Sequence, residues 1–183
     1  MATPKQLVQK VAELTGVPVN TVVQHDRNLA DAGLRTVAGR GRAAARVTSL
    51  DAANLLIAVA ASRNVKDSAL IVQTYGTLEA RGAFTFDEVS RGETLVDALV
   101  FFLELLPKDR DAFADPDKGR MEVRFYGLNP RAEISFLARD VSLDLEFHPG
   151  KTHPSAKWKG MDLEFISRFT QITVGHVGEL ISA

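Results

Sequence analysis

The chain has 183 residues, 45% of them hydrophobic, and its formal net charge at pH 7 is −1. This apolar content is sufficient to bury a core in one or two domains. The chain has no cysteine, which excludes disulfides and thiolate metal sites. No apolar run approaches the length of a membrane span, and no signal-peptide core follows the N-terminal Met-Ala-Thr-Pro-Lys. We therefore expect a soluble, cytoplasmic protein without a membrane partner.

Residues 8–34 have the pattern of two short helices joined by a tight turn. Ala12 is small enough for the point where the helices cross, and Gly16 can adopt the positive φ that the turn requires. Pro18 lies just inside the second helix, where its missing N–H costs nothing, and Val22 can bury that helix against the first. The spacing predicts a helix-turn-helix, which indicates DNA binding.

This part of the chain resembles the winged helix-turn-helix of MerR-type and phage regulators. The resemblance covers the N-terminal third and rests on Leu14-Thr15-Gly16-Val17-Pro18-Val19-Asn20-Thr21-Val22-Val23, Gly33-Leu34, Gly39-Arg40-Gly41-Arg42 and Val47-Thr48-Ser49-Leu50-Asp51. There are two departures: the second helix lacks an aromatic-rich run, and no long C-terminal coiled-coil helix follows. The resemblance implies a DNA-binding mode but no effector and no target gene.

The second helix supplies the first group of candidate contacts with double-stranded DNA. Asn and Gln side chains can pair bidentately with adenine, and an arginine can reach a guanine edge or a phosphate. The candidates in this helix are Val19, Asn20, Thr21, Val23, Gln24 and Arg27. The alternative is a solvated face on an ordinary helical pair.

The second group consists of Arg40, Arg42 and Arg46 in a segment that also contains two glycines. Glycines allow a close backbone approach, while arginines can clamp phosphates or enter a minor groove. We interpret the segment as a wing, with a flexible connector as the alternative. It lacks the lysine and hydroxyl of a phosphate-cradling nucleotide loop.

The charge distribution agrees with DNA binding more than the total charge does. Residues 1–46 contain seven Lys and Arg against three acidic residues, a net charge of +4, so the remainder carries −5. A basic lobe on a mildly acidic body is what attraction to phosphate at one end requires. We expect marked salt dependence and weak affinity per protomer.

The central part predicts three helices, at residues 48–62, 65–80 and 90–106. Thr48 with Asp51, and Ser90 with Glu93, have the spacing of capping boxes that would open the first and third helices. The third helix is apolar around most of its circumference, which indicates either a core helix or a subunit interface. Because two recognition helices of a symmetric protein meet two half-sites, we favour a homodimer.

The C-terminal part changes from a helical to an alternating pattern. A polar linker is expected at residues 108–119, followed by apolar residues at every second position in 121–125, 132–138 and 141–147. This predicts an antiparallel meander with one buried face. Met161, Leu163 and Phe165 could add a fourth strand, and we favour a short terminal helix at residues 170–181.

The expected fold is therefore α+β, with four parts. These are a winged helix-turn-helix lobe at 1–62, central helices for the core or dimerisation at 63–107, a linker at 108–119 and an antiparallel-sheet lobe at 120–183.

No catalytic constellation is evident in the sequence. The histidines, His25, His148, His153 and His176, are scattered and form no pair with metal-ligand spacing on a helix. The aspartates at 109, 111, 115 and 117 lack the glycine and terminal glutamate of a calcium loop. We expect no enzyme activity, no metal site and no cofactor.

Three functions remain. The favoured one is a sequence-specific DNA-binding transcription regulator of phage or mobile-element type. The alternatives are a DNA-recognition subunit of a phage packaging machine, similar to a small terminase, and an interaction module that does not bind DNA.

Overall fold

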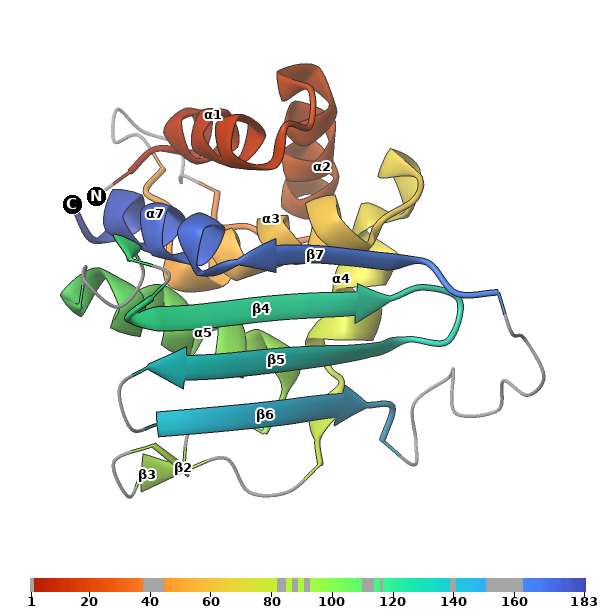
Figure 1. The fold of residues 1–183 in the computed structure, drawn as a ribbon. Helices are drawn as coiled ribbons and strands as arrows, with labels where there is room; N and C mark the ends of the chain where they lie inside the picture. The colour runs from red at the N-terminus through yellow and green to blue at the C-terminus, as the bar shows by residue number, and fades with distance from the viewer. Residues whose placement is uncertain are drawn as a thin grey trace.

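The computed structural model describes residues 2–37, 45–81, 85–86, 89–90, 93–109, 114–115, 117–138, 141–150 and 163–183. Helices occupy the N-terminal half, and a five-stranded antiparallel sheet and a terminal helix follow (Figure 1). The predicted α+β layout is confirmed. Within the described ranges, no helix combines the length and apolar character needed to cross a membrane.

The first two helices are α1 (Pro4–Thr15) and α2 (Val19–Asp31). A capping box between Thr3 and Gln6 opens α1, because each side chain accepts a hydrogen bond from the other residue's backbone N–H. Gly16 ends α1 in the left-handed region, with φ 71°. This is the positive φ that the sequence predicts for the turn.

Helix α3 (Ser49–Ala61) begins at the predicted capping box of Thr48 and Asp51. The prediction of one helix over residues 65–80 is wrong at its C-terminal end. A short 3₁₀ turn, η1 (Val65–Asp67), leads into α4 (Ser68–Gly76), and the chain then forms strand β1 (Glu79–Ala80). Pairing of β1 with the last two residues of β6 (Val141–His148) explains the difference, because it withdraws Glu79 and Ala80 from the helix.

The capping box predicted at Ser90 and Glu93 is also wrong. Ser90 ends strand β3 (Val89–Ser90), which pairs with β2 (Thr85–Phe86). Helix α5 (Leu95–Leu105) instead begins at a box formed by Thr94 and Asp97, and η2 (Leu106–Lys108) follows it. Leu95, Ala98, Leu99, Phe102 and Leu103 are buried, so α5 is a core helix.

The sheet has the strand order β1-β6-β5-β4-β7, and every pair is antiparallel. The predicted meander is confirmed as β4 (Gly119–Tyr126), β5 (Arg131–Ala138) and β6. The fourth strand lies later than predicted. Strand β7 covers Ile166–Thr170, while Leu163 and Phe165 precede it and Met161 lies outside the described residues.

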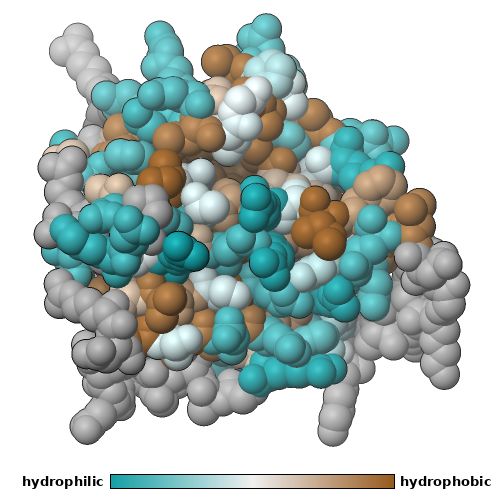
Figure 2. Space-filling model, in the orientation of Figure 1, coloured by the Kyte–Doolittle hydropathy of each residue, from teal (hydrophilic) through white to brown (hydrophobic). Residues whose placement is uncertain are grey.

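The terminal helix is confirmed as α7 (Gln171–Ser182). Helices α3, α5 and α7 lie on one face of the sheet (Figure 1), and one hydrophobic core joins α1, α2 and these helices to the inner side chains of the strands. The opposite face of the sheet carries mainly hydrophilic side chains with apolar ones between them (Figure 2). One buried and one solvated face explain the alternation in the sequence.

Candidate nucleic-acid interface

One exposed face of α2 contains three of the predicted contact residues. Asn20, Gln24 and Arg27 are exposed and follow helical spacing, and Val19, at the N-terminal end, is 49% exposed. On the opposite face, Val22 and Leu29 are fully buried. Because side chains three and four residues apart lie on one side of a helix, these polar groups form a continuous strip. We call Asn20, Gln24 and Arg27 the polar strip of α2.

Two other candidates in α2 do not belong to this strip. Thr21 and Val23 are only partly exposed, and Val23 packs against the hydrophobic core. Because the short Val23 side chain packs against the core, it holds α2 in place and is not itself a contact residue.

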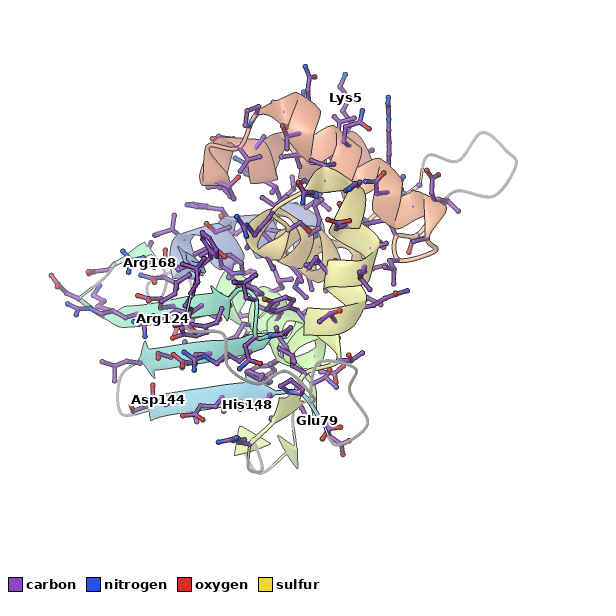
Figure 3. The ribbon with its side chains drawn as sticks, turned by 90° about the vertical axis from the view of Figure 1, so that its right-hand side faces the viewer. Lys5, Glu79, Arg124, Asp144, His148 and Arg168 are labelled. Atoms are coloured by element: carbon purple, nitrogen blue, oxygen red, sulfur yellow. The ribbon has the colours of Figure 1, made fainter. Side chains whose placement is uncertain are left out.

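The predicted wing is described only at its end. Arg40 and Arg42 lie outside the described residues, whereas Arg46 is exposed. The backbone N–H of Val47 donates to the carbonyl oxygen of Ala2 at 3.0 Å, so Arg46 is held near the start of α1. Lys5 on α1 is also exposed and projects away from the sheet (Figure 3). Two cationic side chains therefore lie near the beginning of the chain.

Two hydrogen bonds hold α2 against the beginning of α4. Nδ1 of His25 lies 2.8 Å from Oγ of Ser68, and Nδ2 of Asn28 donates to the carbonyl oxygen of Val65 at 2.7 Å. His25 is buried, so it does not belong to the polar strip of α2. Burial lowers the pKa of His25, because desolvation disfavours the charged imidazolium.

The burial of His25 predicts a pH-dependent stability. The pKa of His25 is near 6.5 in the unfolded chain and lower in the folded protein. The folded protein therefore binds this proton more weakly than the unfolded chain does. The free energy of unfolding should therefore fall as the pH drops below that value, by at most about 1.4 kcal/mol per pH unit from this group. His25→Asn keeps a side-chain N–H for Ser68 but does not titrate. Urea denaturation at several pH values should show a smaller acid loss in this variant, and an unchanged slope would contradict the assignment.

A second cluster ties the chain after α2 to α3. Arg35 Nε and Asp26 Oδ1 form an ion pair of 2.9 Å whose side chains are largely buried. Burial raises the pKa of Asp26, Arg35 opposes this rise and Asp51 adds to it. Asp51 accepts the backbone N–H of Thr36 at 2.6 Å, and Asn54 Nδ2 donates to the carbonyl oxygen of Leu34 at 2.8 Å. These contacts fix the C-terminal half of α2 and the chain that follows it.

This cluster changes the charge available to DNA. In the sequence, Arg35 is one of the seven cationic residues of the basic lobe, and Asp26 is one of its three acidic residues. The structure pairs them with each other. Lys10 is also paired, with Glu13 at 2.9 Å, and Asp31 remains exposed near the C-terminal end of α2. Among the described residues of this lobe, the side chains of Lys5, Arg27 and Arg46 are exposed, and Arg46 also interacts with another part of the chain.

In the described part of the sheet, the outer face does not form a second basic surface. Glu122 pairs with both Arg168, at 2.9 Å, and Arg124, while Arg131 pairs with Glu164 at 3.1 Å. Arg124 and Arg168 project from this face in Figure 3. Because these arginines have carboxylate partners, their charges are compensated locally. The polar strip of α2 and the nearby cations remain the best candidate for phosphate and base contacts.

Metal binding has no support in the described part of the chain, where no group of three or more metal-ligating side chains occurs. His148 Nε2 lies 3.2 Å from the Glu146 carboxylate on the sheet surface, and His176 Nδ1 lies 3.0 Å from Glu179. His153 lies outside the described residues.

The structure contains one feature that the sequence did not indicate, a cavity of about 530 Å³ beside α4. Its walls come from the end of α3, from η1 and α4, from the turn between β4 and β5, and from the start of β7. Only the tertiary fold brings these segments together.

No protein-family model, curated protein or solved structure matches the chain.

Proposed function

We propose that the chain is a sequence-specific DNA-binding transcription regulator of phage or mobile-element type that acts as a homodimer. In this proposal α2 lies in the major groove, and Arg40, Arg42 and Arg46 grip the flanking backbone. The observation that carries the proposal is the polar strip of α2, with its amide and guanidinium groups exposed on one face of a helix that follows a tight turn.

The dimensions and chemistry of α2 support this function. A helix of 13 residues is about 20 Å long, which suits a segment lying in a major groove. No side chain caps its N-terminus, and the Thr21 N–H donates to the Pro18 carbonyl oxygen at 2.8 Å, which leaves the N–H groups of Val19 and Asn20 as the ones that could meet a phosphate. Asn20 and Gln24 offer the amide edge that pairs with adenine, and Arg27 reaches further along the same face.

The rigidity of α2 supports it further. The hydrogen bonds of His25 and Asn28 join it to η1 and α4, and the Asp26–Arg35 pair fixes its C-terminal end. A recognition helix must present its side chains in one orientation, because a small displacement removes bidentate geometry. These contacts leave the polar strip open while they immobilise its scaffold.

The test is a selection of bound fragments from random DNA at two ionic strengths. Asn20→Ala and Gln24→Ala should relax the base preference, with the discrimination at one position falling by about 5- to 100-fold. Gln73→Ala is the matched control, because Gln73 is an exposed glutamine on α4, away from the polar strip. No shift of random duplex DNA and no salt dependence would exclude the proposal and favour an interaction module.

Phosphate contacts should respond differently from base contacts. Arg42→Ala should weaken binding to all sequences alike, and the lost phosphate contact should reduce the salt slope by about 0.9. Arg81→Ala is the control, because this exposed arginine follows β1 at the far edge of the sheet. Unchanged binding by folded Arg42→Ala would remove the wing from the proposal. Light scattering that finds a ring instead of a dimer would assign the motif to DNA packaging.

A further inference from the structure

The cavity beside α4 has an apolar floor and an exposed rim. Ile71 and Tyr75 of α4 and Phe125 of β4 line it, and exposed Leu70 and Ile166 lie at its margin. Its volume of about 530 Å³ lies within the range of small-molecule sites. A cavity of this composition favours an occupant with an apolar body, because burial of apolar surface is favourable.

Two charged side chains line the cavity. Arg63 and Asp67 both line it, and neither forms an ion pair with any described residue. The Arg63 guanidinium stacks on the Phe165 ring, 4.0 Å from its centroid, which holds this cation at the cavity. Asp67 accepts only a long hydrogen bond of 3.3 Å from Asn64 among the described side chains. One cation and one anion therefore face the same space without neutralising each other.

Two hydroxyl groups at the cavity already have protein partners. Tyr75 donates to the Tyr126 carbonyl at 2.6 Å and Ser167 to the Ala60 carbonyl at 2.6 Å. Burial raises the pKa of Tyr75 to about 12, which keeps its hydroxyl a donor.

We infer that this cavity binds a zwitterionic α-amino acid with a large apolar side chain. Arg63 pairs with the carboxylate, and Asp67 pairs with the ammonium group. The side chain lies on the apolar lining formed by Leu70, Ile71 and Ile166. A molecule with only one charge would leave either Asp67 or Arg63 without a partner, and a fully apolar molecule would leave both.

The experiment is calorimetric titration of the whole protein with L-phenylalanine, L-leucine and L-tryptophan. At least one should bind with a dissociation constant on the order of 0.1 mM, which is typical of the affinity that so few atoms can provide. 3-Phenylpropanoate lacks the ammonium group and 2-phenylethylamine lacks the carboxylate. Each should bind at least about tenfold more weakly than phenylalanine, and equal binding of either would overturn the zwitterion assignment.

Variants locate the site. Arg63→Gln and Asp67→Asn should each weaken binding by about tenfold or more, while Lys66→Gln should not, because Lys66 is exposed between them and does not line the cavity. Circular dichroism checks that all three are folded. Absence of binding by all three amino acids at 10-fold the expected dissociation constant would overturn the inference. Light scattering of the Leu70→Asp variant gives a second test. If this substitution converts a dimer to a monomer, the rim of the cavity is a subunit interface and the inference is overturned. Neither result depends on DNA binding.

Discussion

Phe102→Ala is expected to lower the free energy of unfolding by about 3 to 5 kcal/mol. Phe102 is fully buried in α5, and its ring centroid lies 5.2 Å from that of Phe136 on β5 and 5.2 Å from that of Phe101. Truncation would remove the apolar contacts between helix and sheet and leave a cavity that the surrounding core cannot fill. Urea denaturation followed by circular dichroism measures the loss.

Leu137→Ala is the control for this variant. Leu137 follows Phe136 in β5 but is 49% exposed on the outer face of the sheet. Its truncation should change the free energy of unfolding by less than about 1 kcal/mol. Losses of similar size in both variants would contradict the assignment of α5 as the central core helix.

Gly178→Ala is expected to destabilise the protein by about 1 to 3 kcal/mol or more. A Cβ atom at this position of α7 would overlap the carbonyl oxygen of Leu103 and lie 2.7 Å from Cγ of Pro107. The Leu103 oxygen belongs to the backbone, so relief requires a shift of α7 against α5. Alanine's higher helix propensity offsets about 1 kcal/mol of this cost. Thermal unfolding should show a lower midpoint than in the wild-type protein.

Gly76→Ala provides the matched comparison. Gly76 is also a buried helical glycine, but a Cβ there would meet Cβ of Val96 at 3.6 Å, an ordinary contact. Helix propensity should therefore dominate, and stability should stay constant or rise by up to about 1 kcal/mol. If Gly178→Ala behaves like Gly76→Ala, α7 and α5 do not approach as closely as described.

Several elements of the fold could be predicted because their signals are local. Thr48 and Asp51 cap α3 through hydrogen bonds between residues three apart. The alternation in β4, β5 and β6 follows from one buried and one solvated face. Gly16 takes the left-handed conformation at the end of α1. Each signal acts within one turn or one strand.

Three predictions failed where strand pairing competes with a local pattern for the same residues. The pairing of Glu79 and Ala80 with β6 ends the helical region earlier than its pattern indicates. Strand β7 pairs with β4 from Ile166 onward, so the apolar residues before it remain outside the sheet. At α5, two capping signals lie four residues apart, and the pairing of Ser90 with Thr85 removes the first. A local sequence pattern does not show whether a residue is more stable in a helix or cap, or in a paired strand.

The candidate site divides in the same way. Helical spacing alone placed Asn20, Gln24 and Arg27 on one face of α2, because a regular helix fixes their relative directions. The burial of His25 and the pairing of Arg35 with Asp26 depend on α3, η1 and α4. Helical spacing predicts the direction in which a side chain leaves its own helix. It does not predict which residues of other elements pack against that side chain.

The sequence by itself determined the helix-turn-helix spacing, the basic N-terminal lobe, the meander and the terminal helix, since each depends on neighbouring residues. The tertiary structure decided which cations remain exposed, how α7 fits against α5 through Gly178, and how the cavity beside α4 is enclosed. These features require contacts between residues far apart in the chain. Such contacts form only when burial of the common core outweighs the entropy of closing the intervening loops.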